Sequence, residues 1–318
     1  MTSPLPGYGA GLTDDLILGH IAWYTITKPQ LTHDDILELV TDLGLDANIV
    51  PKPPRAGDAF KRACRYSERN GIPVPYSDNT ANYMIRSVAQ TATEIERHVM
   101  LEIVDSDGRR LEYHKAAELK FNRKDSRLSV SMKQVNPDMD PITKETLERF
   151  AAELNYATKY IEAQVIRRMI RQQLDNMHAI LARSKGSVYF VPNKYKKKMA
   201  ALEEFTANCG HGSVFHTIPL IDDSKQQELI ANAFNESVHE NATQIIAELQ
   251  SFTDQGKQMT VNAWNDYKQR FDALAAKSSE YTELVDFELD KATLELEVLS
   301  EHLNDFLLSG NIKLDGGR

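Results

Sequence analysis

Three side chains that can bind soft metals or act in nucleophilic chemistry lie close together near the middle of the chain. Cys209, His211 and His216 form a C-x-H-x4-H pattern, and thiolate and imidazole are ligands that zinc prefers. A structural zinc site needs four ligands, and this spacing fits no standard pairing unless the distant Cys64 joins it. Cys209 beside His211 could also form a nucleophile–base pair, but no third residue that would orient the histidine is identifiable. We therefore predict no metal site and no cofactor.

The adjacent carboxylates Asp222 and Asp223 are a second candidate, either for binding a cation or for placing negative charge at the start of the following helix, where the helix dipole favours it. We favour the helix start. The chain contains no Gly-rich phosphate loop, no HExxH and no GxSxG motif. We therefore predict no catalytic residue and lean away from an enzyme.

A basic segment is the sharpest chemical feature. Residues 159–198 hold ten Lys and Arg against two acids, whereas residues 199–318 hold eight bases against twenty-one acids. Such a segment can contact a nucleic-acid backbone, match the acidic arm of its own chain, or form a solvated face. The sequence leaves these three readings open. The candidate nucleic-acid-binding residues are Arg167, Arg168, Arg171, Arg183, Lys185, Lys194, Lys196, Lys197 and Lys198.

Bulk composition limits the class of protein. The chain has 318 residues, a formal charge of −9 and a hydrophobic fraction of 42%, values that are ordinary for a folded protein. No run of 18 apolar residues is present, so we expect no membrane span. Met1–Thr13 lacks the basic start and apolar core of a signal peptide. Because the two cysteines are far apart, we expect no disulfide framework and a cytoplasmic location.

We expect three helices over residues 14–70. The first carries an apolar stripe from Leu16 to Tyr24, and the second begins with a capping-box arrangement of Thr32 and Asp35 and ends at Gly44. The third, over residues 57–68, has a basic outer face, which is typical either of a DNA-reading helix or of a solvated surface.

The hydrophobic period changes to two over residues 83–132. Alternation along 95–103, a turn at 105–108 and further strand-like runs up to residue 132 predict an antiparallel meander of three or four strands. Because a lone meander buries too little apolar surface, we expect neighbouring helices to cover one face.

The rest of the chain predicts long helices around a small insert. A helix of roughly 40 residues follows Pro141, and residues 187–223 read as a parallel, right-handed β-α-β unit. Residues 224–308 read as a helical arm in which Gly256 forms a hairpin or kink, and drifting spacing favours a bundle over one extended coiled coil. The predicted fold class is α+β and predominantly helical. Its predicted parts are an N-terminal helical unit (1–76), a β-meander (77–140), a long helix with the insert (141–223) and a C-terminal arm (224–318).

Four short stretches carry a resemblance to a known family. These are Leu18–Tyr24 (LGHIAWY), Pro53–Phe60 (PPRAGDAF), Val188–Pro192 (VYFVP) and Phe215–Asp222 (FHTIPLID). In their order along the chain they resemble an uncharacterised family seen in bacteriophages and mobile elements of actinobacteria. The resemblance spans most of the chain. It implies a cytoplasmic role in phage or host-conflict biology and transfers no functional residue.

These observations predict a non-enzymatic binding or assembly protein. We expect the helical arms to mediate self-association or docking of a protein partner, and the basic segment to contact DNA or RNA. The alternative is an enzyme, or an inhibitor of a host enzyme, in phage–host conflict. An enzyme would gather distant His, Asp or Cys side chains in one pocket.

Overall fold

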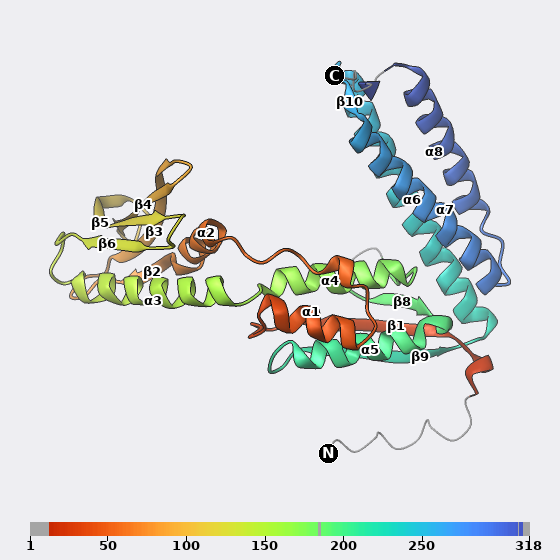
Figure 1. Cartoon of the computed structure of the whole chain (residues 1–318), viewed down its shortest axis with the longest axis horizontal. Helices are drawn as coiled ribbons and strands as arrows, with labels where there is room; N and C mark the ends of the chain where they lie inside the picture. The colour runs from red at the N-terminus through yellow and green to blue at the C-terminus, as the bar shows by residue number, and fades with distance from the viewer. Residues whose placement is uncertain (1–12, 184–185, 311, 314–318) are drawn as a thin grey trace. The chain divides into compact units, whose positions relative to one another are not determined.

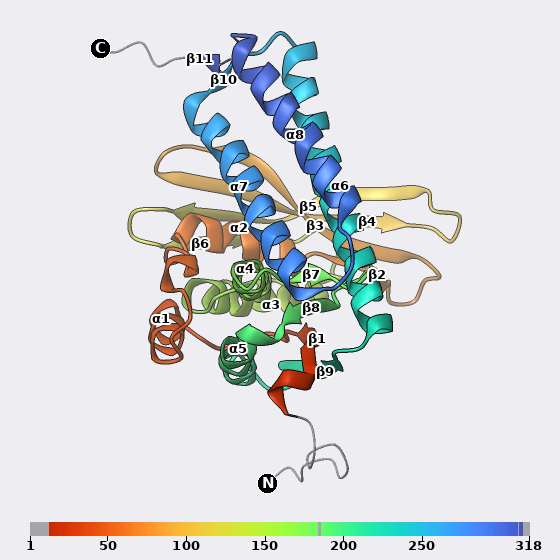
Figure 2. The same cartoon turned by 90° about the vertical axis from the view of Figure 1, so that its right-hand side faces the viewer.

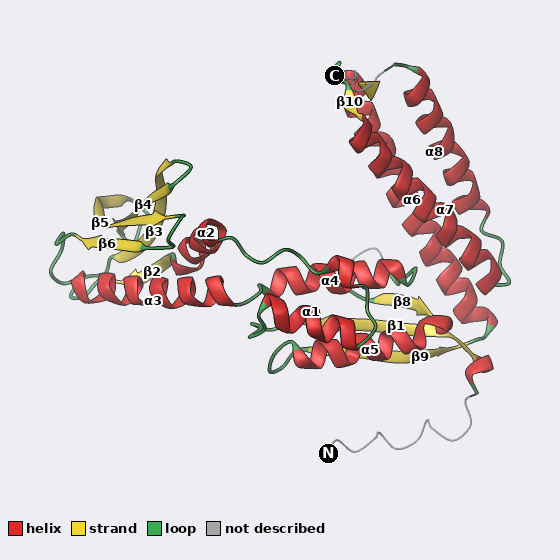
Figure 3. Cartoon of the chain, in the orientation of Figure 1, coloured by secondary structure: helices red, strands yellow, loops and turns green. Residues whose placement is uncertain are grey.

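The computed structural model describes residues 13–183, 186–310 and 312–313, and the chain divides into two compact units. One unit contains the described parts of Met1–Thr27 and Arg167–Arg318, together with Val40–Asp46; the other contains Lys28–Leu39 and Ala47–Ile166. Each unit has its own antiparallel sheet (Figures 1 and 3). With 51% helix and 24% strand, the fold is a mixed α+β fold. The prediction of a predominantly helical chain with one small insert is therefore wrong.

The sheet of the second unit is a five-stranded meander in which each strand pairs with the next along the chain. The predicted turn at residues 105–108 is present, with Gly108 at a φ of 80° and the Asp105 carboxylate accepting from the backbone of Asp107 and Arg109. The sheet has one or two strands more than the sequence predicted. The strands are β2 (Arg69–Pro73), β3 (Thr80–Gln90), β4 (Glu94–Val104), β5 (Arg110–Asn122) and β6 (Leu128–Met132).

Helices α2 (Ala56–Ser67) and α3 (Asp140–Lys159) bury one face of this sheet, as expected. The Phe60 ring of α2 stacks on Phe121 of β5 at a centroid distance of 4.8 Å and meets Phe150 of α3 edge-on at 5.7 Å. All three rings are buried. Helix, sheet and helix therefore share one aromatic core.

The predicted helix of about 40 residues is wrong, because α3 ends at Lys159 and α4 (Ala163–Asn176) begins after a break. Tyr160 is extended, and the backbone N–H of Ile161 donates to the carbonyl of Leu31. The Arg62 guanidinium donates to the carbonyls of Ala157 and Tyr160 at the end of α3. Contacts from distant segments thus end a helix that no Gly or Pro interrupts.

Helix α1 (His33–Asp42) has the predicted ends. The Thr32 hydroxyl accepts from the Asp35 backbone, and the Asp35 carboxylate accepts from the Thr32 backbone and hydroxyl. These hydrogen bonds, the one from the Thr32 backbone first, lower the pKa of the Asp35 carboxyl. Gly44 follows the helix with a φ of 64°. The capping box and the left-handed glycine are both confirmed.

The first unit is built on β1 (Ile17–Thr25), which lies between β8 (Tyr189–Pro192) and β9 (Val214–Ile221) and is antiparallel to both. The short edge strand β7 (Ile180–Leu181) pairs with β8. The N-terminal helix predicted for these residues is wrong. A short apolar run fits both periodicities, and the β-branched and aromatic residues here favour a strand that is buried on both faces.

The predicted β-α-β insert is also wrong in its pairing. Strands β8 and β9 run in the same direction, but β1 separates them, so they do not pair with each other. Helix α5 (Lys196–Asn208) connects them as a crossover that spans an inserted strand. Helices α4 and α5 lie on one side of this sheet and α6 on the other (Figure 2).

The arm of the first unit consists of α6 (Ser224–Asp254), α7 (Val261–Leu284) and α8 (Asp290–Leu308), which pack as a bundle (Figure 1). Gly256, with a φ of 59°, lies in the predicted hairpin. A second turn at residues 285–289 was not predicted. Phe234 and Tyr281 join the core that includes Phe190 of the sheet, and the short strands β10 (Met259–Thr260) and β11 (Ile312–Lys313) pair near the distal end. None of the described helices has both the length and the apolar character needed to cross a bilayer.

A glycine substitution distinguishes the observed strand from the predicted helix. A Cβ on Gly19 would lie 2.5 Å from the Phe190 ring and 2.5 Å from the Val191 carbonyl oxygen. We expect Gly19→Ala to lower the free energy of unfolding by about 1 to 3 kcal/mol, because the close approach of β8 cannot accommodate the methyl group. Denaturant titration of the full chain measures this.

The control is Gly57→Ala in α2, where an added Cβ meets only ordinary contacts at 3.5 Å. It should stabilise the chain by about 0.4 to 1 kcal/mol. Stabilisation by Gly19→Ala as well would contradict the strand and favour a helix.

A polar cavity and a cationic face as candidate binding sites

Three of the predicted nucleic-acid-binding residues are engaged by the protein itself. The Arg167 guanidinium donates to the Ile26 carbonyl at 2.6 Å. The Lys194 ammonium lies 2.8 Å from Glu280, and the Lys196 ammonium lies 2.6 Å from Asp14. Glu280 belongs to the acidic arm, so an internal match of the kind considered from the sequence is observed for Lys194.

The other described members of the predicted set are exposed and form no ion pair within the described part of the chain. Arg168 and Arg171 lie on α4, and Lys197 and Lys198 lie in the first turn of α5. The Lys198 ammonium is 5.8 Å from the centre of the Tyr195 ring. Arg183 is exposed in the loop before β8, and Lys185 lies outside the described residues. The predicted set therefore divides into internal and solvent-facing cations.

The carboxylate of Glu280 on α7 organises a cluster that the sequence did not reveal. One oxygen, Oε2, accepts from Lys194 at 2.8 Å and from Tyr195 at 3.2 Å, and it also contacts Nδ1 of His178. The side chain is 10% exposed, and its other oxygen, Oε1, has no partner among the described residues. The hydrogen bond with Glu280 is the main cause that raises the pKa of Lys194.

Two more side chains of α7 hold the segment that leads into β7. The Lys277 ammonium donates to the Ala179 carbonyl at 2.9 Å, and the Tyr281 hydroxyl donates to the His178 carbonyl at 3.0 Å. His178 has a φ of 52°, a left-handed conformation that is uncommon for a residue other than glycine. Residues 277, 280 and 281 share one face of the helix, so α7 fixes a strained backbone position at the sheet edge.

A cavity of about 770 Å³ lies beside this segment. It is lined by residues from α4, β7, β8, α6 and α7. Burial lowers the pKa of the Lys277 ammonium. Burial also raises the pKa of the Asp175 carboxyl, and the positive charges of Lys277 and Arg171 partly offset that rise. The charged and polar lining residues are Arg171, Asp175, Asn176, His178, Tyr189, Ser237, Asn241, Arg270 and Lys277.

Of these lining residues, only Arg171 belongs to the set predicted from the sequence. The signal for Lys277 is present in the sequence, since it falls between Leu274 and Tyr281 in an apolar stripe at spacings of three and four. Asp175 and His178 carry no comparable signal, because a break after α4 redirects the chain there.

The sequence-based zinc and nucleophile candidates are not assembled into a site. The buried Cys209 thiol donates to the Phe205 carbonyl, and burial raises its pKa to about 12. The His216 ring lies 5.3 Å from the Trp23 ring, and the His211 carbonyl accepts from Thr27. Across the described ranges no group of three or more His, Cys, Asp or Glu could hold a metal ion. Cys64 is a buried free cysteine.

Asp222 and Asp223 start α6, as expected. The Asp223 carboxylate accepts from the backbone N–H of Gln226 at 3.0 Å, and Asp222 accepts from the Gln227 side chain at 2.7 Å. The helix-start interpretation of these two acids is confirmed.

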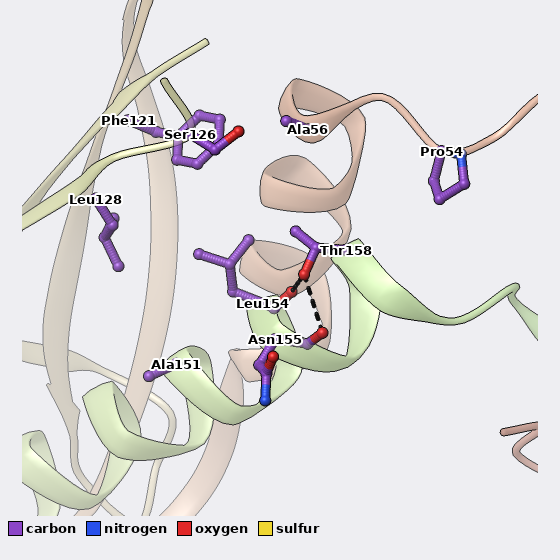
Figure 4. A pocket seen from close by; sticks show the side chains of 9 residues that line it. All are labelled: Pro54, Ala56, Phe121, Ser126, Leu128, Ala151, Leu154, Asn155 and Thr158. Atoms are coloured by element: carbon purple, nitrogen blue, oxygen red, sulfur yellow. Dashed lines mark hydrogen bonds between the residues drawn. The ribbon is translucent and has the colours of Figure 1, made fainter. Parts of the chain in front are cut away.

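In the second unit, two arginines that the sequence places on or after α2 contact the protein itself, and the pocket described below is uncharged. In α2, Arg62 caps α3 through its two carbonyl contacts, and Arg69 after the helix lies 3.0 Å from Glu145. A pocket of about 490 Å³ between α2, α3 and the sheet has no charged lining residue (Figure 4). The Thr158 hydroxyl donates to carbonyls of its own helix. Phe121, Leu128 and Leu154 make this pocket mainly apolar.

Comparison with protein families matches residues 17–311 to DUF6744, a family of unknown function. Because the match covers most of the chain, the protein belongs to this family. No curated protein and no solved structure matches the chain. The resemblance to an uncharacterised family is thereby supported at the level of family, while an actinobacterial or phage origin stays a prediction.

Removal of the Glu280 carboxylate should destabilise the first unit. We expect Glu280→Ala to lower the free energy of unfolding by about 2 to 3 kcal/mol, because the acceptor shared by His178, Lys194 and Tyr195 is lost. The control is Glu283→Ala, an exposed site on the same helix, which should change stability by less than about 0.5 kcal/mol. Equal effects in chemical denaturation would show that the cluster is not a stabilising contact.

Proposed function

We propose that this protein acts by binding and assembly, contacting DNA or RNA through a cationic face on α4 and α5 and a protein partner through its helical arm. The observation that carries the proposal is a set of solvent-facing cations that no described acid neutralises. In a chain with a formal charge of −9, a local excess of positive charge can attract a polyanion to that part of the surface. We call the exposed cations Arg168 of α4, Lys197 and Lys198 of α5, and Arg183 of the loop before β8 the cationic face.

The position of the lysines supports this assignment. Lys197 and Lys198 occupy the first turn of α5, and no acidic residue lies in that turn. Cations at a helix N-terminus oppose the helix dipole and cost stability. Polyanion binding would offset this cost, because phosphates are favoured both by the lysines and by the positive end of the helix.

The arm supports the protein-binding part of the proposal through α8. Leu294 is 61% exposed and Leu308 is 83% exposed. The two lie fourteen positions apart, which is two heptads, so they are on the same side of the helix. We propose that this side of α8 packs against a second copy of the chain.

An enzyme is the second candidate, and the polar cavity is the observation that favours it. Asp175 and His178 lie three positions apart, at and just after the end of α4, and the cavity brings them together with Lys277 of the distant helix α7. In an enzyme of this kind, Glu280 would fix the tautomer of His178 as a general base. Turnover of a bound ligand that His178→Ala abolishes without weakening binding would favour this candidate.

Nucleic-acid binding should depend steeply on salt and on the cationic face. We expect the affinity for labelled duplex DNA or single-stranded RNA to fall steeply between about 50 and 200 mM salt. Lys197→Ala with Lys198→Ala should reduce the slope of log K against log salt by about 2, because each phosphate contact contributes about 1. Fluorescence anisotropy measures both quantities.

The charge-matched control is Lys225→Ala with Lys291→Ala, two exposed lysines of α6 and α8 that should leave the slope unchanged. Absent or salt-insensitive retention of both nucleic acids, or equal effects of the two double variants, would reject the cationic face as a nucleic-acid site.

Self-association through α8 should appear in sedimentation equilibrium. We expect the wild type to dimerise and Leu294→Ser with Leu308→Ser to weaken the dimer at least about tenfold, since each buried leucine contributes on the order of 1.5 to 3 kcal/mol. Glu228→Ser, at an exposed site on α6, should leave the dimer intact. A monomeric wild type at high concentration would exclude this mode of assembly.

A further inference from the structure

The cavity beside β7 has the composition of a site for an anion that also carries hydrogen-bond donors. Arg171, Arg270 and Lys277 bring three positive charges to its lining and Asp175 brings one negative charge. Arg270 is already paired with Glu248 at 2.7 Å. Arg171 and Lys277 are therefore the cations that a ligand would meet.

Lys277 retains unused donor capacity. An ammonium group has three N–H donors, and the described contacts of Lys277 use one of them, on the Ala179 carbonyl. Burial disfavours its charged form, and an anion in the cavity would stabilise that form. The position is therefore costly without a ligand and favourable with one.

Asp175 and Lys277 line the same cavity. Each feels the charge of the other, yet no ion pair joins them among the described contacts. Because both line the cavity without forming an ion pair, one ligand could contact both. The side chains of Asn176, Asn241 and Ser237 add neutral donors and acceptors, and Tyr189 adds an aromatic wall.

We propose that this cavity binds a mononucleotide, with its phosphate at Arg171 and Lys277 and its sugar hydroxyl or base amino groups at Asp175 and the neighbouring amides. The volume of about 770 Å³ lies in the range of small-ligand sites. A bare cation is disfavoured by the excess of positive charge, and a purely apolar ligand would make no use of Asp175 or of the remaining donors of Lys277. The proposal does not depend on the cationic face.

The test uses the full chain and isothermal titration calorimetry with four probes, which are adenosine 5′-monophosphate, guanosine 5′-monophosphate, adenosine and inorganic phosphate. We expect saturable one-to-one binding of at least one mononucleotide. Adenosine and inorganic phosphate should each bind at least about tenfold more weakly, because each lacks half of the contacts.

The informative variant is Arg171→Gln, because Arg171 is exposed and holds no described ion pair, so the fold should tolerate its loss. It should weaken mononucleotide binding at least about tenfold. Asp175→Asn keeps the shape and removes the negative charge, and it should alter the preference between the two mononucleotides. The control, Lys268→Gln, removes one exposed positive charge from α7 outside the cavity and should bind like the wild type.

The absence of saturable binding of both mononucleotides would overturn the proposal, as would binding that Arg171→Gln leaves unchanged. Inorganic phosphate binding as tightly as the mononucleotides would overturn the nucleotide assignment and leave only an anion site. Loss of polymer binding in the Lys197 and Lys198 variant with intact mononucleotide binding would show that the two sites fail independently.

Discussion

The insertion of β1 between β8 and β9 is the constraint on which the first unit depends. β9 pairs with β1 along most of its length and β8 pairs with residues 19–22, so the N-terminal segment joins strands that lie about 170 to 200 residues later. The β1–β8 pairing requires the backbone of Gly19 to pass directly against Phe190. Phe190 in turn packs edge-on against Tyr281 of α7. The position of the arm helix thus follows from a strand that forms only when the N-terminal segment meets residues 189–221.

Tyr281 connects this packing to the wall of the cavity beside β7. Tyr281 stacks on Phe234 of α6 at 4.5 Å, and its hydroxyl holds the carbonyl of His178. One turn earlier, Lys277 holds the next carbonyl. Apolar packing therefore sets the position of α7, and polar contacts set the position of residues 178–179 in the cavity wall. Sites supported in this way need little reorganisation to bind a ligand.

Local signals predicted the parts of the fold that local interactions determine. The Thr32–Asp35 capping box, Gly44, the Asp105–Gly108 turn and the Asp223 cap all depend on residues within a few positions of one another. The strand at residues 17–25 and the end of α3 could not be predicted, because β8, β9, Leu31 and Arg62 determine them from far along the chain. Where a segment fits two periodicities, its distant partners decide between them.

In the candidate site, too, the sequence revealed what depends on neighbouring residues and missed what depends on distant ones. Charge clustering pointed to Arg171, but Lys277 and Glu280 join Asp175 and His178 only through the packing of α7 against the sheet edge. None of these four improves the core as an apolar residue would. Lys277 interrupts an apolar stripe, His178 holds a left-handed backbone, and Glu280 has a buried oxygen without a described partner. Replacement of buried charges by well-packed apolar residues is often neutral or stabilising. These departures from consistent packing lie around one cavity, and such departures concentrate at functional sites.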